Sequence, residues 1–166
     1  MYQPYPTSGQ GPASPPQGPA PQPITMAVRF MYAGAALSAI EIIIGLTTIG
    51  SLKQAIRSQY PNYSASQIHT AEVAGVAVAV VIGALAIGLW LWMARANGKG
   101  RNWARIVASV LFGFNTIDLL TLIGRPHPAI SLVFALLVWL VGLGAIFFLW
   151  QRESTAYFQA KSQRQR

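Results

Sequence analysis

The chain contains no cysteine, only two histidines and only four acidic residues among its 166 positions. Without cysteine it forms no disulfide, no thiolate metal site and no cysteine nucleophile. Charged residues make up 10% of the chain and hydrophobic residues 53%, whereas a soluble domain carries about a quarter charged residues. This composition argues against an ordinary water-soluble globule. It also leaves little material for a catalytic centre, so we expect no enzyme, no metal site and no cofactor.

Proline is unevenly distributed. Eight of the eleven prolines fall within the first 28 residues, together with glycine, glutamine and serine, and this stretch has no charged side chain. A segment with almost no aliphatic residues cannot bury a core. We therefore expect residues 1–26 to form a disordered, proline-rich tail.

Four long apolar segments follow the tail, each of about 21 to 24 residues. At 1.5 Å per helical residue, such a segment crosses the roughly 30 Å hydrocarbon core of a bilayer. The predicted fold is an all-α polytopic membrane protein, a four-transmembrane-helix bundle at residues 27–151 followed by a basic tail at 152–166. The predicted spans are 27–50, 71–94, 104–124 and 129–150.

The placement of Lys and Arg predicts the orientation of the bundle. The two terminal regions and the connection between the second and third spans hold nine basic residues, and the opposite side holds three. By the positive-inside rule, both termini are expected in the cytoplasm. The net charge of +8 is thus explained without nucleic acid. Four basic residues around the second connection are candidates for contact with anionic lipids: Arg95, Lys99, Arg101 and Arg105.

The first connection, residues 51–70, carries two local signals. Leu52, Ile56 and Tyr60 are spaced four apart among polar residues, which predicts an amphipathic helix along the membrane interface. Ser64 followed by Gln67 has the spacing of a capping box and predicts the start of the second span.

Small residues recur at four-residue spacing on the first two spans, which permits close helix approach. We expect these stripes to serve packing within the chain rather than a dimer interface. They comprise Gly34, Ala35, Ser38 and Ala39 on the first span and Ala71, Gly75, Ala79 and Gly83 on the second.

Glu41 and Asp118 are the acidic residues that fall well inside predicted spans. Counted from the basic residues that flank each span, Glu41, Asp118 and Trp139 all lie about 18 to 20 Å from the cytoplasmic interface. Asn115 shares a helix face with Asp118. These four residues predict a polar site near the membrane midplane, because ionisable groups are costly there and are functional candidates by default.

Two interpretations of this site remain open. In the first, the carboxyls bind a proton or a cation. In the second, they stay protonated in the hydrocarbon and form hydrogen bonds that hold helices together. No Lys or Arg lies at the depth of these carboxyls to offer a counter-charge, since Arg29 and Arg105 stand at the ends of their spans, which favours protonated acids in both cases.

Several segments together resemble a family of uncharacterised actinobacterial four-helix integral membrane proteins with a Pro-rich N-terminal tail. They are residues 29–39 (RFMYAGAALSA), 89–105 (LWLWMARANGKGRNWAR), 138–145 (VWLVGLGA) and 150–158 (WQRESTAYF). The resemblance covers residues 27–158 and is most specific at 90–105. It implies a multi-pass protein of the bacterial cytoplasmic membrane, and it implies no reaction.

Two functions follow as hypotheses. The first is a non-enzymatic accessory or interaction subunit that contacts the lipid bilayer and a membrane or cytoplasmic protein partner, or a second copy of itself. The alternative is a small proton- or cation-coupled transporter using Glu41 and Asp118. Small multidrug exporters, which also have four helices and a glutamate in the first, offer an analogy for Glu41.

Overall fold

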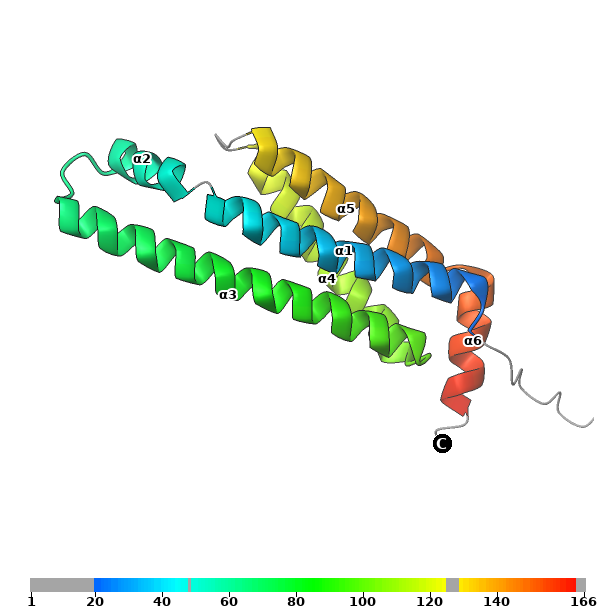
Figure 1. Ribbon diagram of the computed structural model, residues 1–166. Helices are drawn as coiled ribbons and strands as arrows, with labels where there is room; N and C mark the ends of the chain where they lie inside the picture. The colour runs from blue at the N-terminus through cyan, green and yellow to red at the C-terminus, as the bar shows by residue number, and fades with distance from the viewer. Residues whose placement is uncertain (1–19, 48, 125–128, 164–166) are drawn as a thin grey trace, which may run out of the picture.

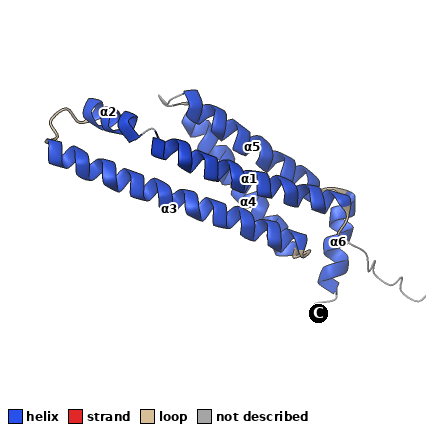
Figure 2. Ribbon diagram, viewed as in Figure 1, coloured by secondary structure: helices blue, strands red, loops and turns tan. Residues whose placement is uncertain are grey.

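The computed structural model describes residues 20–47, 49–124 and 129–163, and every regular element in these ranges is a helix (Figure 2). Four of the helices are long and apolar enough to cross a membrane, and they pack together (Figure 1). The predicted all-α, four-span fold is confirmed. In chain order the helices are α1 (Gln22–Thr47), α2 (Ile49–Gln59), α3 (Ala65–Gly98), α4 (Asn102–Ile123), α5 (Ala129–Leu149) and α6 (Arg152–Gln163).

The helix boundaries follow local chemistry. The Ser64 hydroxyl accepts a hydrogen bond from the Gln67 backbone N–H, and the Gln67 side chain accepts one from the Ser64 N–H, so the predicted capping box begins α3. Helix α1 begins within the predicted tail, because proline is tolerated in a first helical turn and Ile24 is fully buried. Residues 1–19 of that tail lie outside the described ranges.

Helix α1 lies between two neighbours. It packs against α3 on one side and α5 on the other, while α4 packs against α5 and, less extensively, against α3. In the described chain the backbones of α1 and α4 do not approach each other. These two helices therefore occupy diagonal positions in the bundle.

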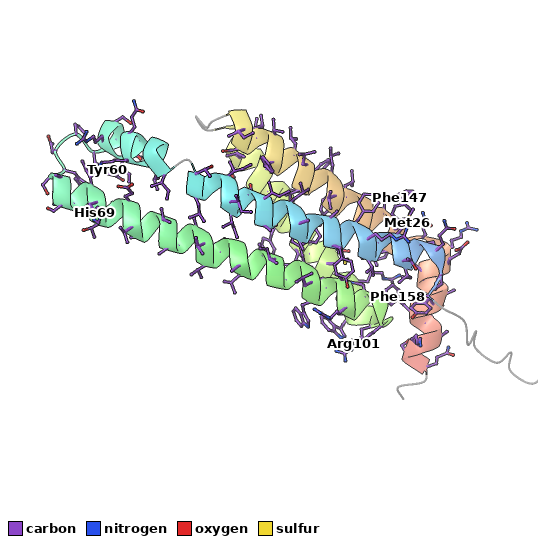
Figure 3. All side chains as sticks on the ribbon, in the orientation of Figure 1. Met26, Tyr60, His69, Arg101, Phe147 and Phe158 are labelled. Atoms are coloured by element: carbon purple, nitrogen blue, oxygen red, sulfur yellow. The ribbon has the colours of Figure 1, made fainter. Side chains whose placement is uncertain are left out.

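The buried core lies at one end of the bundle, which we call the α6 end. It joins residues from α1, α3, α4, α5 and α6 in one cluster. The fully or almost fully buried members include Ile24, Met31, Leu149 and Phe158. Figure 3 shows Phe158 at this end, together with Arg101. Along the rest of the spans, large apolar side chains such as Leu85 and Phe114 are exposed, as expected for faces that meet lipid.

The opposite end, which we call the α2 end, is formed differently. Helix α3 has 34 residues, about 51 Å at 1.5 Å per residue, and is longer than a hydrocarbon core. Figure 1 shows its first turns and α2 extending beyond the ends of α4 and α5. The predicted helix in the first connection is thus present as α2, and it packs on α3. Tyr60 and His69 mark this end in Figure 3.

Three glycines of the small-residue stripes lie at contacts between helices of the chain. A Cβ on Gly34 would lie 2.7 Å from the Trp90 ring, and one on Gly83 would lie 2.5 Å from the Ile42 side chain. At the α2 end, Leu52 lies 3.6 Å from a Cβ placed on Gly75. The glycines thus let α1 and α2 pack closely on α3.

Helix α6 was not predicted, since residues 152–163 were interpreted as a basic tail. It closes the α6 end of the bundle through Phe158 and the fully buried Ser154, whose hydroxyl donates to the Phe148 carbonyl at 2.7 Å. Tyr157 donates to the Gly98 carbonyl at 3.3 Å and its ring packs on Gly100, whose φ of +72° suits glycine. These contacts attach α6 to the turn between α3 and α4.

Candidate functional site

Glu41 on α1 and Asp118 on α4 form what we call the carboxyl pair. Although their helices are diagonal, the two carboxylates lie close enough to repel each other electrostatically. Both residues are exposed. Within the described chain, neither carboxyl group accepts a hydrogen bond or forms an ion pair. The two carboxyl groups therefore interact with each other, but no other described residue forms a hydrogen bond or an ion pair with either of them.

The position of Glu41 coincides with a change in packing along α1. Gly34, Ala35 and Ser38 are buried, and no described residue of α1 after Ser38 is buried. Asp118 lies beside Leu119, which is 8% exposed and is the last buried residue of α4. The carboxyl pair thus lies where the bundle loosens toward the α2 end.

Trp139 on α5 has a different polar partner from the one expected. Its indole N–H donates to the Thr116 hydroxyl at 3.0 Å, and that hydroxyl donates to the Phe112 carbonyl at 2.9 Å. The Trp139 ring also packs on Phe112, with 5.7 Å between ring centroids. Trp139 therefore joins α5 to α4 instead of serving the carboxyl pair. Thr116 was missed in the sequence because a threonine inside an apolar span has no spacing signal of its own.

Asn115 lies one turn before Asp118 on α4 but faces a different space. Its side chain helps to line a cavity of about 160 Å³ between α1, α3, α4 and α5. The Asn115 Oδ1 atom is buried and has no hydrogen-bond partner. No hydrogen bond joins Asn115 to Asp118 in the ranges the structure covers. Asn115 is therefore associated with this cavity and not with the carboxyl pair.

The four basic residues of the α6 end fall into two groups. Arg95, Lys99 and Arg101 are exposed. Arg105 is half-buried, with its guanidinium 4.4 Å from the Trp150 ring centroid and 5.3 Å from that of Phe158. It also donates to the Thr155 hydroxyl at 3.0 Å. Arg105 thus holds α6 on α4, and the other three are free to meet an anionic surface.

Aromatic side chains accompany these basic residues. Trp92 and Trp103 pack together, with 5.4 Å between ring centroids, and both are exposed. Trp150 is exposed as well, and its N–H donates to the Ser109 hydroxyl at 3.0 Å. Exposed indoles next to basic residues are typical of a membrane–water interface.

No metal site is apparent in the described part of the chain, where no three His or acidic residues gather. A second hollow at the α2 end has both His69 and Glu72 in its lining, with apolar neighbours from α2 and α3. Two potential ligands are fewer than a structural metal site needs.

Comparison with known proteins adds no identification. No family model, curated protein or solved structure matches this chain. What the findings establish is a polytopic membrane protein with four packed spans.

Proposed function

We propose that this chain is a non-enzymatic accessory or interaction subunit of a membrane assembly. A helix of its partner would cover the carboxyl pair. The observation that carries this proposal is the exposure of Glu41 and Asp118 within apolar spans, with no hydrogen-bond partner in the described chain. A second copy of the chain is one possible partner.

Energetics support a protein partner over lipid. A charged carboxylate at the centre of a bilayer costs about 3 kcal/mol on insertion scales, and hydrocarbon offers a protonated carboxyl no hydrogen-bond acceptor or donor. A neighbouring helix with polar side chains removes this cost. The surrounding exposed residues, including Ile40, Ile117 and Leu120, provide an apolar rim for such a helix.

Site-specific photocrosslinking in native membranes tests the proposal. A photoreactive residue at Ile117 or Leu120, beside Asp118, should yield one discrete protein adduct, identifiable by mass spectrometry. The matched control is Phe147, which is 64% exposed like Leu120 but lies near the α6 end. Equal yields at all three positions, or lipid adducts alone, would contradict the proposal.

Substitution of Glu41 sharpens the same test. Glu41→Leu should abolish the Leu120 adduct because it removes the polar contact. Glu41→Gln should keep the adduct if the partner hydrogen-bonds to a protonated carboxyl, and should lose it if the partner carries a positive charge. An adduct that survives Glu41→Leu would exclude Glu41 from the interface.

A second candidate function is a proton- or cation-coupled transporter, favoured by the electrostatic interaction between the two carboxylates. A shared proton or cation would relieve their repulsion. Purified protein in liposomes should then show ion or cationic-drug flux that disappears with Glu41→Gln. Flux that is absent, or indifferent to this substitution, would eliminate the transporter.

The proposed location is a bacterial cytoplasmic membrane, with both termini in the cytoplasm and anionic lipids at the α6 end. Support comes from the basic and indole side chains gathered there. Because the chain has no cysteine, single cysteines at Lys99 and Asn62 can report topology. In intact cells, a membrane-impermeant maleimide should label position 62 and spare position 99. The reverse pattern would invert the orientation.

A further inference from the structure

The interior cavity is a groove, because it is open on one side. Of the four sides of the bundle, the one between α3 and α4 has the loosest packing in the described chain. Figure 1 shows that α4 begins beside the end of α3 and lies beside α5 at its far end. The cavity therefore opens between α3 and α4, and we call it the lateral groove. Its walls include Ala86, Leu89 and Met93 of α3 and Ala108 and Leu111 of α4.

Exposed apolar side chains flank the opening on both helices. Leu85, Leu89 and Trp92 follow one another at spacings of four and three, so they share one face of α3. Trp103 and Phe114, eleven residues apart, share one face of α4 in the same way. All five are exposed, and the Trp92 and Trp103 rings pack together across the two helices. The groove thus begins at this tryptophan pair and continues where α3 and α4 separate.

Basic side chains stand beyond the tryptophan pair, at the turn between α3 and α4. Lys99 comes seven residues after Trp92 and continues the same face of α3, and Arg101 is the N-cap of α4. Both are exposed, and in the described chain neither forms an ion pair. Lys161 of α6 adds a third cation, since its Cγ lies 2.9 Å from a Cβ placed on Gly100. Exposed indoles beside basic residues are typical of the headgroup level of a membrane.

The depth of the groove matches the acyl chains of one leaflet. Counted along α4 at 1.5 Å per residue, Ala108 lies about 10 Å from Arg101 and Asn115 about 21 Å, whereas one leaflet with its headgroups is about 20 to 22 Å thick. We infer that the lateral groove binds one acyl chain of an anionic phospholipid, whose phosphate lies against Lys99 and Arg101. This goes beyond a general attraction of anionic lipids to the α6 end, because one chain enters the bundle.

The lining suits a hydrocarbon chain. It holds no charged side chain, and its asparagine, Asn115, has a buried Oδ1 atom that offers no acceptor to the groove. Met31 and Met93 contribute flexible side chains that adapt to irregular shapes. The groove measures about 160 Å³, which admits a single file of methylene groups, whereas an α-helix is about 10 to 12 Å across and is too wide. Because the groove is open, the rest of the lipid remains in the bilayer.

The unpaired cations select the headgroup. Basic residues at the membrane surface attract anionic lipids, whereas phosphatidylcholine brings its own positive charge to the same place. The tryptophan pair lies between the cations and the apolar lining, where the glycerol and ester groups of a lipid are polar on one side and apolar on the other. The order of cations, indoles and apolar groove along α3 and α4 therefore follows the order of groups along a phospholipid.

Native mass spectrometry tests the inference. Full-length protein in dodecyl maltoside micelles is titrated with phosphatidylglycerol or with phosphatidylcholine of the same chains. We expect saturable binding of one phosphatidylglycerol, about tenfold tighter than phosphatidylcholine, since two basic contacts distinguish the headgroups. Lysophosphatidylglycerol, with one chain, should bind about as tightly. Dihexanoyl phosphatidylglycerol has the same headgroup but chains too short to fill the groove, so its binding should be at least about tenfold weaker.

Variants in the groove locate the acyl chain. Ala86→Phe places a ring in the groove from α3 and should weaken long-chain phosphatidylglycerol at least about tenfold. Ala84→Phe is the matched control, because Ala84 is exposed and outside the lining, and it should leave binding unchanged. Leu89→Trp, at the exposed edge of the lining, replaces Ala86→Phe if that variant fails to fold.

Variants at the turn locate the phosphate. Lys99→Gln combined with Arg101→Gln should reduce the affinity for phosphatidylglycerol to that for phosphatidylcholine. The control removes the same charge at the α2 end by combining Lys53→Gln with Arg57→Gln, at two exposed positions, and should keep the preference.

Several outcomes overturn the inference. They are no saturable lipid binding, equal affinities for the two headgroups, equal binding of long and dihexanoyl chains, binding that survives the groove variants, and a preference that survives the loss of Lys99 and Arg101. A dimer of the chain that Ala86→Phe dissociates would assign the groove to a second copy instead. Each result stands independently of the proposed partner, because none of these variants alters Glu41 or Asp118.

Discussion

At the α6 end, Ile24, Met31, Leu149 and Phe158 are at most 1% exposed, whereas no residue of α3 between Ile68 and Met93 is buried. One end of the bundle thus holds a core shared by five helices, and the other has helices with little buried surface between them. The carboxyl pair lies where the packing loosens. We infer that contacts at the α6 end stabilise the fold, whereas residues toward the α2 end are available to bind a partner helix.

The largest expected effect comes from Phe158. Phe158→Ala removes a fully buried ring and should lower the free energy of unfolding by about 3 to 5 kcal/mol, measured by detergent-induced unfolding in mixed micelles. Phe147→Ala, at a position 64% exposed, should cost less than about 1 kcal/mol. Equal costs would break the distinction between buried and exposed positions at this end.

A pair of glycines gives the next effect. Gly34→Ala places a methyl group 2.7 Å from the Trp90 ring and should destabilise the protein by about 1 to 3 kcal/mol through overpacking. Gly88→Ala meets nothing within 4 Å, so it should be neutral or stabilise by up to about 1 kcal/mol. The same unfolding assay checks both. A neutral Gly34→Ala would mean that α1 and α3 are not held closely together here.

Arg105 should show a smaller effect. Arg105→Lys keeps the charge but loses the planar group between Trp150 and Phe158, so we expect a loss of about 1 to 2 kcal/mol and faster proteolysis within α6. Arg101→Lys, on the exposed neighbour, should change neither. If both variants behave alike, Arg105 does not attach α6 to the bundle.

The smallest change in stability is expected at the carboxyl pair. Combining Glu41→Leu with Asp118→Leu removes two exposed groups that have no hydrogen-bond partner in the described chain, so unfolding in micelles should shift by less than about 0.5 kcal/mol. The same double variant should lose the crosslinked partner in membranes. A large loss of stability would instead show that the carboxyls support the fold. The assignment of fold stability to the α6 end alone would then be wrong.

The sequence predicted the spans well because their signal is simple. Long apolar runs have few structural alternatives to transmembrane helices. The Ser64–Gln67 spacing also correctly predicted where α3 begins. Counting residues from the basic flanks predicted one depth for Glu41 and Asp118, and the two carboxyl groups interact electrostatically. Depth along a helix can be predicted from the sequence by counting residues.

Rotation about the helix axis is not readable in the same way. The spans are apolar on all sides, so no periodicity indicates which face meets a neighbour. Trp139 therefore shares a predicted depth with Asp118 but bonds to Thr116, and Asn115 faces the cavity. Helix α6 was missed because it is short and polar, and its one fully buried aromatic side chain, Phe158, gives no periodic pattern.

The core at the α6 end also constrains how the protein is made. Ile24 comes from the start of the described chain and Phe158 from near its end, yet both belong to the same buried cluster. During synthesis, α1 reaches the membrane long before α6 leaves the ribosome. The spans must therefore remain in the bilayer with an unfinished core until α6 has been synthesised. A premature stop codon between residues 150 and 158 would leave all four spans present but their common core without Phe158, and such a product would be a substrate for membrane quality-control proteases.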